Sequence, residues 1–126
     1  MRLRVCIPTR VVLDREVAAI VAEGPDGSFG LRPRHIDFIA PLVPGLLAYR
    51  PAADAEELFL AVDRGVLVKR GPEVRVSVRN AVIDEPLERL ARVVAERFAR
   101  VDDREREVRA AVARLEADFL RRFMEI

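Results

Sequence analysis

The chain is poor in the side chains that carry enzyme chemistry. Its 126 residues include single copies of His, Cys, Lys, Tyr and Thr and two serines, namely His35, Cys6, Lys69, Tyr49, Thr9, Ser28 and Ser77. A nucleophile with its base and orienting group would have to come almost wholly from Ser28, His35 and Asp37, which share one short segment without a nucleophile elbow. Cys6, His35 and Asp37 are too few for a metal site and lack ligand spacing. We therefore expect no catalytic residue, no metal and no cofactor.

Other absences narrow the class of protein further. Lys and Arg number 22 against 21 Asp and Glu, so the net charge of +1 provides no field that would favour nucleic acid or an anionic membrane. Cys6 has no partner for a disulfide within the chain, and no apolar run approaches the roughly 20 residues of a membrane span. Residues 1–10 lack the apolar core of a signal peptide. We expect a cytoplasmic protein with no nucleic-acid partner and no segment inserted into the membrane.

Glycine and proline are missing from the last third of the chain. All eight prolines lie at or before Pro86 and all six glycines at or before Gly71, whereas about half of residues 84–126 are charged. With 51% hydrophobic residues the chain is able to bury a real core. The change in composition predicts two parts, a domain over 1–83 and a second over 84–126.

The first part has the period of β-strands. Residues 74–79 alternate strictly, with Val74, Val76 and Val78 on one face and polar side chains on the other. Turn signals such as "GPDGS" and "RGPE" separate short runs rich in Val, Ile and Leu. These features predict an antiparallel β-sandwich over 1–83, in which residues 27–47 form a loop rich in Gly and Pro.

The second part has the period of α-helices. Two apolar stripes recur at steps of three and four, the first with Leu87, Leu90, Val94, Phe98 and Val101, the second with Val108, Val112, Leu115, Phe119 and Phe123. Pro86 suits the first helical turn, and Asp102 or Asp103 suits the cap of a second helix. We predict a helical hairpin over 84–126, and hence a fold class of β plus α.

The stretch "GPDGSFGLRPRHIDFIAPLVPGLL" resembles a segment of the epsilon subunit of F-type ATP synthases. The family pattern Gly-x-x-Gly-x-x-Pro-x-His, followed by Pro-Gly, is met by Gly27, Gly30, Pro33, His35, Pro44 and Gly45. The order of strands around this stretch and the terminal helical pair agree with the family as well. The resemblance implies a sandwich with a helical hairpin, working as a noncatalytic rotor subunit that joins the gamma shaft to the membrane ring of c subunits.

The same resemblance implies roles for particular residues. It assigns Ser28, Arg32, Arg34, His35 and Asp37 to the contact with the c-ring, and it gives Gly27, Gly30, Pro33, Pro44 and Gly45 the shaping of the loop. The hairpin of many bacterial members reaches the alpha and beta catalytic subunits, a regulatory contact that would involve Arg114, Arg121 and Arg122. The implied location is peripheral, on the cytoplasmic face of the bacterial inner membrane, through the ATP synthase complex.

The sequence also departs from the common pattern. Arg34 stands where Gly is usual, Ser28-Phe29 replaces an acidic-aliphatic pair, and Phe119 and Phe123 are bulkier than usual. These departures resemble the alternate, sodium-type branch. The hairpin motif by which some relatives bind ATP is incomplete, since only Arg109-Ala110 fits, so we expect no ATP site of that kind.

Two other functions stay open on the residues alone. The chain would also suit a generic sandwich binding module with a helical dimerisation tail, or a small hydrolase that uses Ser28 or His35. In the simplest interpretation of the loop, Gly30 and Pro33 only shape a turn and His35 makes a local hydrogen bond.

Overall fold

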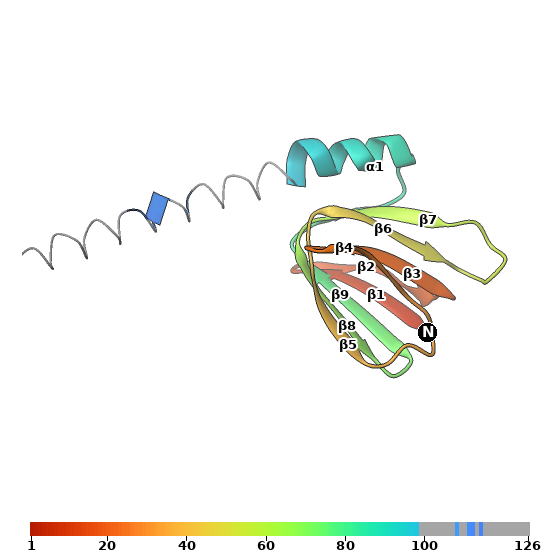
Figure 1. The fold of residues 1–126 in the computed structure, drawn as a ribbon. Coiled ribbons are helices and arrows are strands. Elements are labelled where there is room, and N and C mark those ends of the chain that lie inside the picture. The colour runs from red at the N-terminus through yellow and green to blue at the C-terminus, as the bar shows by residue number, and fades with distance from the viewer. Residues whose placement is uncertain (99–107, 109–110, 113, 115–126) are drawn as a thin grey trace, which may run out of the picture.

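A computed structural model describes residues 1–98, 108, 111–112 and 114 of the chain. Two five-stranded sheets pack face to face as a sandwich, with a helix on the outer side of one of them (Figure 1). The first sheet has the order β2 (Arg10–Glu16), β1 (Arg2–Ile7), β9 (Glu73–Val78), β8 (Gly65–Arg70) and β5 (Phe38–Leu42). The second has the order β10 (Ala81–Val82), β7 (Leu58–Val62), β6 (Gly45–Arg50), β3 (Ala19–Gly24) and β4 (Gly27–Leu31). The predicted sandwich is confirmed.

The core lies between the sheets and follows the alternation of the strands. In β9, Val74, Val76 and Val78 are buried while the residues between them are exposed. They meet side chains of both sheets that are almost fully buried, among them Leu3, Ile20, Leu47, Leu60 and Leu67. Each such side chain stabilises the fold by about 1.5–3 kcal/mol relative to an exposed one, so the core holds the two sheets together.

One pair of strands differs from the antiparallel prediction. β1 and β9 run parallel, with Leu3 opposite Val74 and Val5 opposite Val76, whereas the other pairs are antiparallel. Alternation of buried and exposed residues is the same in both kinds of pair, so the sequence pattern could not distinguish them.

Residues 27–47 are not one loop, as the Gly and Pro content predicted. They form β4, a short turn over 32–37, β5 and the start of β6. β4 and β5 are edge strands, one in each sheet, and an edge tolerates Gly30 in β4 and Pro41 in β5, because a missing side chain or N–H there costs little pairing. Gly and Pro therefore mark edges here as well as turns.

The helix packs on the outer face of the second sheet. α1 (Leu87–Val93) continues into a π-helical turn, η1 (Val94–Phe98), and buries Leu90 and Phe98 against Ala61 of β7. Leu87, predicted in the same apolar stripe, is 46% exposed. Pro86 caps the helix at its N-terminus one position before the predicted first turn, and its carbonyl accepts from the N–H groups of Arg89 and Leu90.

The predicted hairpin lies largely outside the described residues. This holds for Val101, Asp102, Asp103, Leu115, Phe119 and Phe123, whereas Val108 and Val112 are described and exposed. β10 ends at Val82 and α1 begins at Leu87, so the division at 83/84 falls in the connection between them and stays a prediction.

Candidate functional site

The segment over residues 32–37 carries four of the five residues predicted for the c-ring contact. It links the edge strand of one sheet to the edge strand of the other, because β4 and β5 belong to different sheets. The N–H of His35 donates to the carbonyl of Arg32 at 3.0 Å and closes a turn in which Pro33 is the second residue. Pro is favoured there because its fixed φ suits that position. Arg32 and Arg34 are exposed on this turn.

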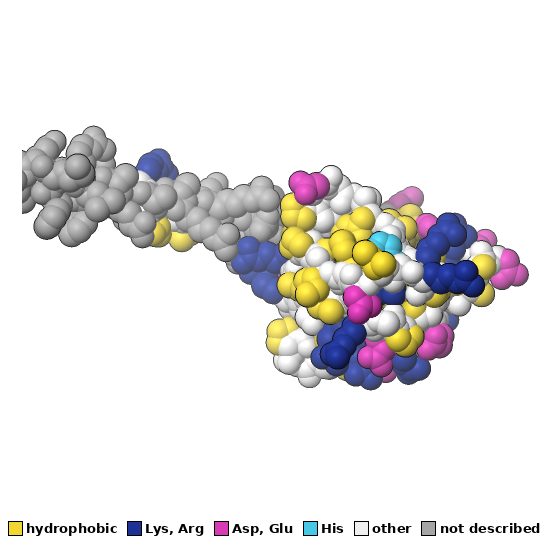
Figure 2. Space-filling view, turned by 60° about the horizontal axis from the view of Figure 1, so that its bottom comes forward, with side chains coloured by type: hydrophobic (Ala, Val, Ile, Leu, Met, Phe, Trp, Pro, Cys, Tyr) yellow, Lys and Arg dark blue, Asp and Glu magenta, His cyan; other side chains and the backbone are white. Residues whose placement is uncertain are grey.

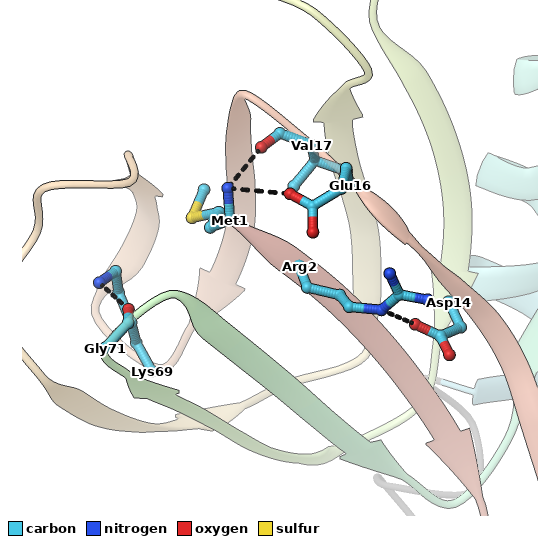
Figure 3. Close-up of polar contacts among 7 residues, drawn as sticks. All are labelled: Met1, Arg2, Asp14, Glu16, Val17, Lys69 and Gly71. Atoms are coloured by element: carbon cyan, nitrogen blue, oxygen red, sulfur yellow. Dashed lines mark hydrogen bonds and ion pairs between the residues drawn. The ribbon is translucent and has the colours of Figure 1, made fainter.

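The buried side chain of Lys69 fixes the backbone of the turn. Its Nζ donates to the carbonyl of His35 and to the carbonyl of Gly71, both at 2.7 Å, and the residue is only 2% exposed. Figure 3 shows Lys69 turned back onto Gly71 at the end of the β8–β9 hairpin. Burial removes water from the ammonium group, and the two carbonyl oxygens compensate by accepting its hydrogen bonds. No pattern in the sequence predicted a role for Lys69, although its position two residues after the buried Leu67 places it on the inward face of β8.

Asp37 holds the other side of the same junction. Its Oδ1 accepts a hydrogen bond from the N–H of Gly71 at 2.8 Å. Gly71 has a φ of 56°, the left-handed region that glycine adopts without strain. Together with the two bonds of Lys69, this contact ties residues 35–37 to the β8–β9 turn, so the carboxylate predicted for the c-ring also has a role within the chain.

Aromatic rings fill the space under the turn. The ring centroids of His35 and Phe38 are 5.5 Å apart, and those of Phe38 and Phe29 are also 5.5 Å apart, each pair in an edge-to-face arrangement. The Nδ1 of His35 lies 2.8 Å from the carbonyl oxygen of Ile36. Because a carbonyl only accepts, this nitrogen is the protonated one in the neutral ring. These bonds of His35 and Asp37 go to backbone groups and not to each other, which gives the hydrolase alternative no support.

The other predicted residues are spread around this junction. Ser28 is exposed in β4, Gly27 has a φ of 120° at the β3–β4 turn, and Gly30 lies opposite Val21 inside β4 instead of in a loop. Pro44 precedes β6, and a Cβ on Gly45 would collide with the side chain of Glu23. Arg114 is exposed, and Arg121 and Arg122 lie outside the described residues.

An apolar surface, which the sequence did not predict, borders the turn. Ile36 is 78% exposed and Ile39 is 71% exposed. Ile39 belongs to a shallow groove of about 460 Å³, whose other lining residues are Asp37, Phe38, Val68, Lys69 and Arg70. Figure 2 shows the histidine, in cyan, with basic side chains on one side and hydrophobic side chains on the other. The turn therefore presents charge and apolar area together, an arrangement suited to a protein contact.

A second polar cluster lies on the outer face of the first sheet. The Nε of Arg2 donates to Asp14 at 2.7 Å, and Arg4 contacts the same carboxylate at 3.4 Å (Figure 3 shows the first pair). The hydrogen bond from Arg2 holds the pKa of Asp14 below its usual range and raises the pKa of Arg2. Asp14 thus joins β2 to β1 by an exposed ion pair of modest strength.

Comparison with known proteins identifies the family of the sandwich. Residues 1–84 match the family described as ATP synthase, Delta/Epsilon chain, beta-sandwich domain. The chain belongs to this family. The predicted resemblance to epsilon subunits of F-type ATP synthases is thereby confirmed.

Relatives within the delta/epsilon family match almost the whole chain. The ATP synthase epsilon chain 2 of Paraburkholderia xenovorans is 31% identical over 126 residues, which cover 98% of this chain and 90% of the relative. The epsilon chain 2 of Cereibacter sphaeroides is 35% identical and covers 98% of this chain and 86% of its own length. The epsilon chain of Moorella thermoacetica is 36% identical, with 93% of this chain and 95% of the relative covered.

Solved structures of ATP synthases share the fold. A chain of the OSCP/F1/c-ring assembly from the mitochondrial ATP synthase of Euglena gracilis superposes with a TM-score of 0.61 at 22% identity, covering 75% of this chain and 61% of that one. A chain of the central stalk and c-ring structure from Tetrahymena thermophila gives a TM-score of 0.56 at 15% identity, with 66% of each chain covered. Among the described residues, no helical segment has both the length and the hydropathy of a membrane span.

Proposed function

We propose that the chain is a noncatalytic rotor subunit of an F-type ATP synthase that joins the gamma subunit to the c-ring. The observation that carries this proposal is the anchored turn at 32–37 in a chain that is similar over 98% of its length to an epsilon chain. The solved structures with the same fold come from assemblies that include a c-ring, and one is described as a central stalk. In this role the chain binds partners and transmits rotation, while catalysis belongs to other subunits.

The mechanics of the turn suit such a coupling. A contact that transmits torque must keep its shape under load, and a segment that is already ordered loses little entropy on docking. Lys69 and Asp37 hold the backbone of the turn to the β8–β9 hairpin, and Pro33 restricts it further. Arg32, Arg34 and Ser28 then face outward from a fixed base, as a contact with the ring requires.

Copurification tests this function directly. The full chain, tagged and coexpressed with the gamma subunit and the c subunits of its own ATP synthase, should retain both after detergent extraction. A matched variant, Arg97→Glu, changes an exposed residue of η1 outside the turn and should retain them equally. Retention of neither partner, together with a stable dimer of the isolated chain, would support the alternative of a sandwich module with a helical dimerisation tail.

The C-terminal segment has a regulatory role in this proposal. Arg114, Arg121 and Arg122 would meet acidic residues of the alpha and beta subunits and restrain ATP hydrolysis, since cations and carboxylates attract across an interface. Truncation after Phe98 is the suitable test, because truncation after Ile83 would remove α1 and uncover Ala61 and its apolar neighbours. We expect the assembled complex with the truncated chain to hydrolyse ATP faster. An unchanged rate in a fully assembled complex would show that the segment does not restrain the motor.

A further inference from the structure

We infer that this turn binds a polypeptide loop of its partner, and that this loop carries carboxylates next to an apolar side chain. The surface in question, called the docking turn below, consists of Arg32, Arg34, Ile36 and Ile39. This inference rests on the proposed function, because it states the chemistry of the c-ring loop that the turn would contact.

The charge around the docking turn differs from that of the whole chain. Residues 32–37 and 69–71 hold four cationic side chains and one carboxylate, Asp37, whereas the complete chain has a net charge of only +1. The Asp37 carboxylate already accepts the N–H of Gly71. Neither Arg32 nor Arg34 takes part in an ion pair with any residue that the structure describes. Two exposed guanidinium groups are thus available to an acidic partner.

The geometry of the two arginines suits oxyanion partners such as carboxylates. A guanidinium group presents a planar fork of N–H donors that matches the two oxygens of a carboxylate. Both arginines flank Pro33 in a turn closed by the bond from His35 to Arg32, and Lys69 holds the following backbone. The two forks therefore start from a fixed backbone, so less freedom is lost when they bind.

The two isoleucines of the docking turn indicate that the partner also offers an apolar side chain. Ile36 and Ile39 are 78% and 71% exposed, and Ile39 lines the groove of about 460 Å³ together with Val68. Burial of such side chains stabilises a contact in proportion to the apolar area removed from water. An acidic loop with an apolar side chain beside its carboxylates would fill both parts at once.

A membrane surface fits these observations less well. Binding to anionic headgroups typically uses clusters of about four to eight Lys and Arg side chains. Lys69 is buried and already bonded to two carbonyls, which leaves three cations near the docking turn, and the net charge of +1 adds almost no long-range attraction.

Charge reversal tests the inference. The full chain with Arg32→Glu and Arg34→Glu is compared with the wild type for binding to the immobilised gamma and c-ring complex of the same ATP synthase, at low and high salt. The matched control reverses Arg10 and Arg97, which are exposed and lie outside the docking turn. We expect the double reversal to weaken binding at least about tenfold at low salt and the control to change it less than about twofold. Substitution of the facing carboxylates of the c subunit by Lys should restore the affinity of the reversed variant.

The outcomes separate this inference from the proposed function. If the wild type does not bind the complex, the proposed function fails together with the inference. If the wild type binds and the double reversal binds equally well, the rotor function stands and the acidic partner is wrong. Capture of the wild type, but not of the reversed variant, by vesicles of equal parts phosphatidylcholine and phosphatidylserine, with no c-ring dependence of binding, would show that lipid headgroups are the partner and overturn the inference.

Discussion

The ammonium group of Lys69 lies 2.7 Å from the carbonyl oxygen of His35, which is 34 positions earlier in the chain. A side chain from the buried face of β8 thereby fixes the backbone of the exposed turn that leads into the neighbouring strand β5. The stability of the turn depends on the core through this contact, so core and surface should respond together to substitution.

Replacement of Lys69 by Met tests this dependence. The variant keeps the length of the side chain but loses two charge-assisted hydrogen bonds, each to a backbone carbonyl. We expect the free energy of unfolding to fall by about 2 kcal/mol, as for hydrogen bonds with a charged donor. Urea denaturation of the full chain measures the loss. The control Arg70→Met, at the exposed neighbour, should stay within about 0.5 kcal/mol of the wild type, and equal stability of both variants would contradict the anchoring role.

Asp37 offers a finer test of the same junction. Asp37→Ala removes the acceptor of the Gly71 N–H and should cost about 1 kcal/mol of stability. Asp37→Asn keeps an oxygen at the same position and should recover most of this loss. Thermal unfolding of the two variants side by side measures the difference, and equal destabilisation by Asn and Ala would show that the hydrogen bond is not what matters.

The packing of α1 on the sandwich depends on one buried leucine. Leu90 is 1% exposed, whereas Leu87, one turn earlier, is 46% exposed. We expect Leu90→Ala to destabilise the helix and its contact with β7 by about 2–4 kcal/mol, because it leaves a cavity, and Leu87→Ala to cost less than about 1 kcal/mol. Amide hydrogen exchange within α1 measures both. Equal protection of the helix in the two variants would mean that α1 is not held by this contact.

Because of the ion pair of Asp14 with Arg2, we expect the stability of the fold to depend on pH. The hydrogen bond from Arg2 lowers the pKa of Asp14 in the folded chain below its ordinary value of 3.8. Near that value the unfolded chain binds more protons than the folded chain, so the contribution of Asp14 to stability is present above pH 3.8 and is lost as pH falls through the lower, folded value. The melting temperature of Asp14→Asn should therefore lie below that of the wild type at neutral pH, and the gap should close in acid. A gap that widens in acid would have the wrong sign.

The fold was predictable from the sequence where a strand or helix buries one face, because its apolar residues then recur with a regular period. Alternation in residues 73–78 and the helical spacing around Leu90 both identified side chains that the structure buries. The sequence pattern predicts a loop where the edge strands β4 and β5 lie, because Gly30 and Pro41 are typical of turns and only tertiary pairing shows that they lie at sheet edges.

A turn around Pro33 and His35 was predictable from the sequence, but the contacts that hold it were not. The family pattern located the turn with Pro33 and His35, since these residues fix a local backbone shape. No sequence pattern indicated the role of Lys69, because its partner His35 lies 34 positions away on another strand connection and such a contact leaves no periodic signal in the sequence. The exposure of Ile36 and Ile39 could not be predicted either, because an isoleucine in an apolar run is ordinarily expected in the core.

The central claim, that this chain couples the gamma shaft to the c-ring, is tested most directly by ion pumping. ATP synthase assembled without the chain is reconstituted into lipid vesicles, and ATP-driven ion uptake is measured per ATP hydrolysed before and after addition of the purified full chain. We expect the wild-type chain to raise the uptake per ATP and the Arg32→Glu, Arg34→Glu variant to raise it much less. Uptake per ATP that is the same with and without the chain would contradict the rotor function.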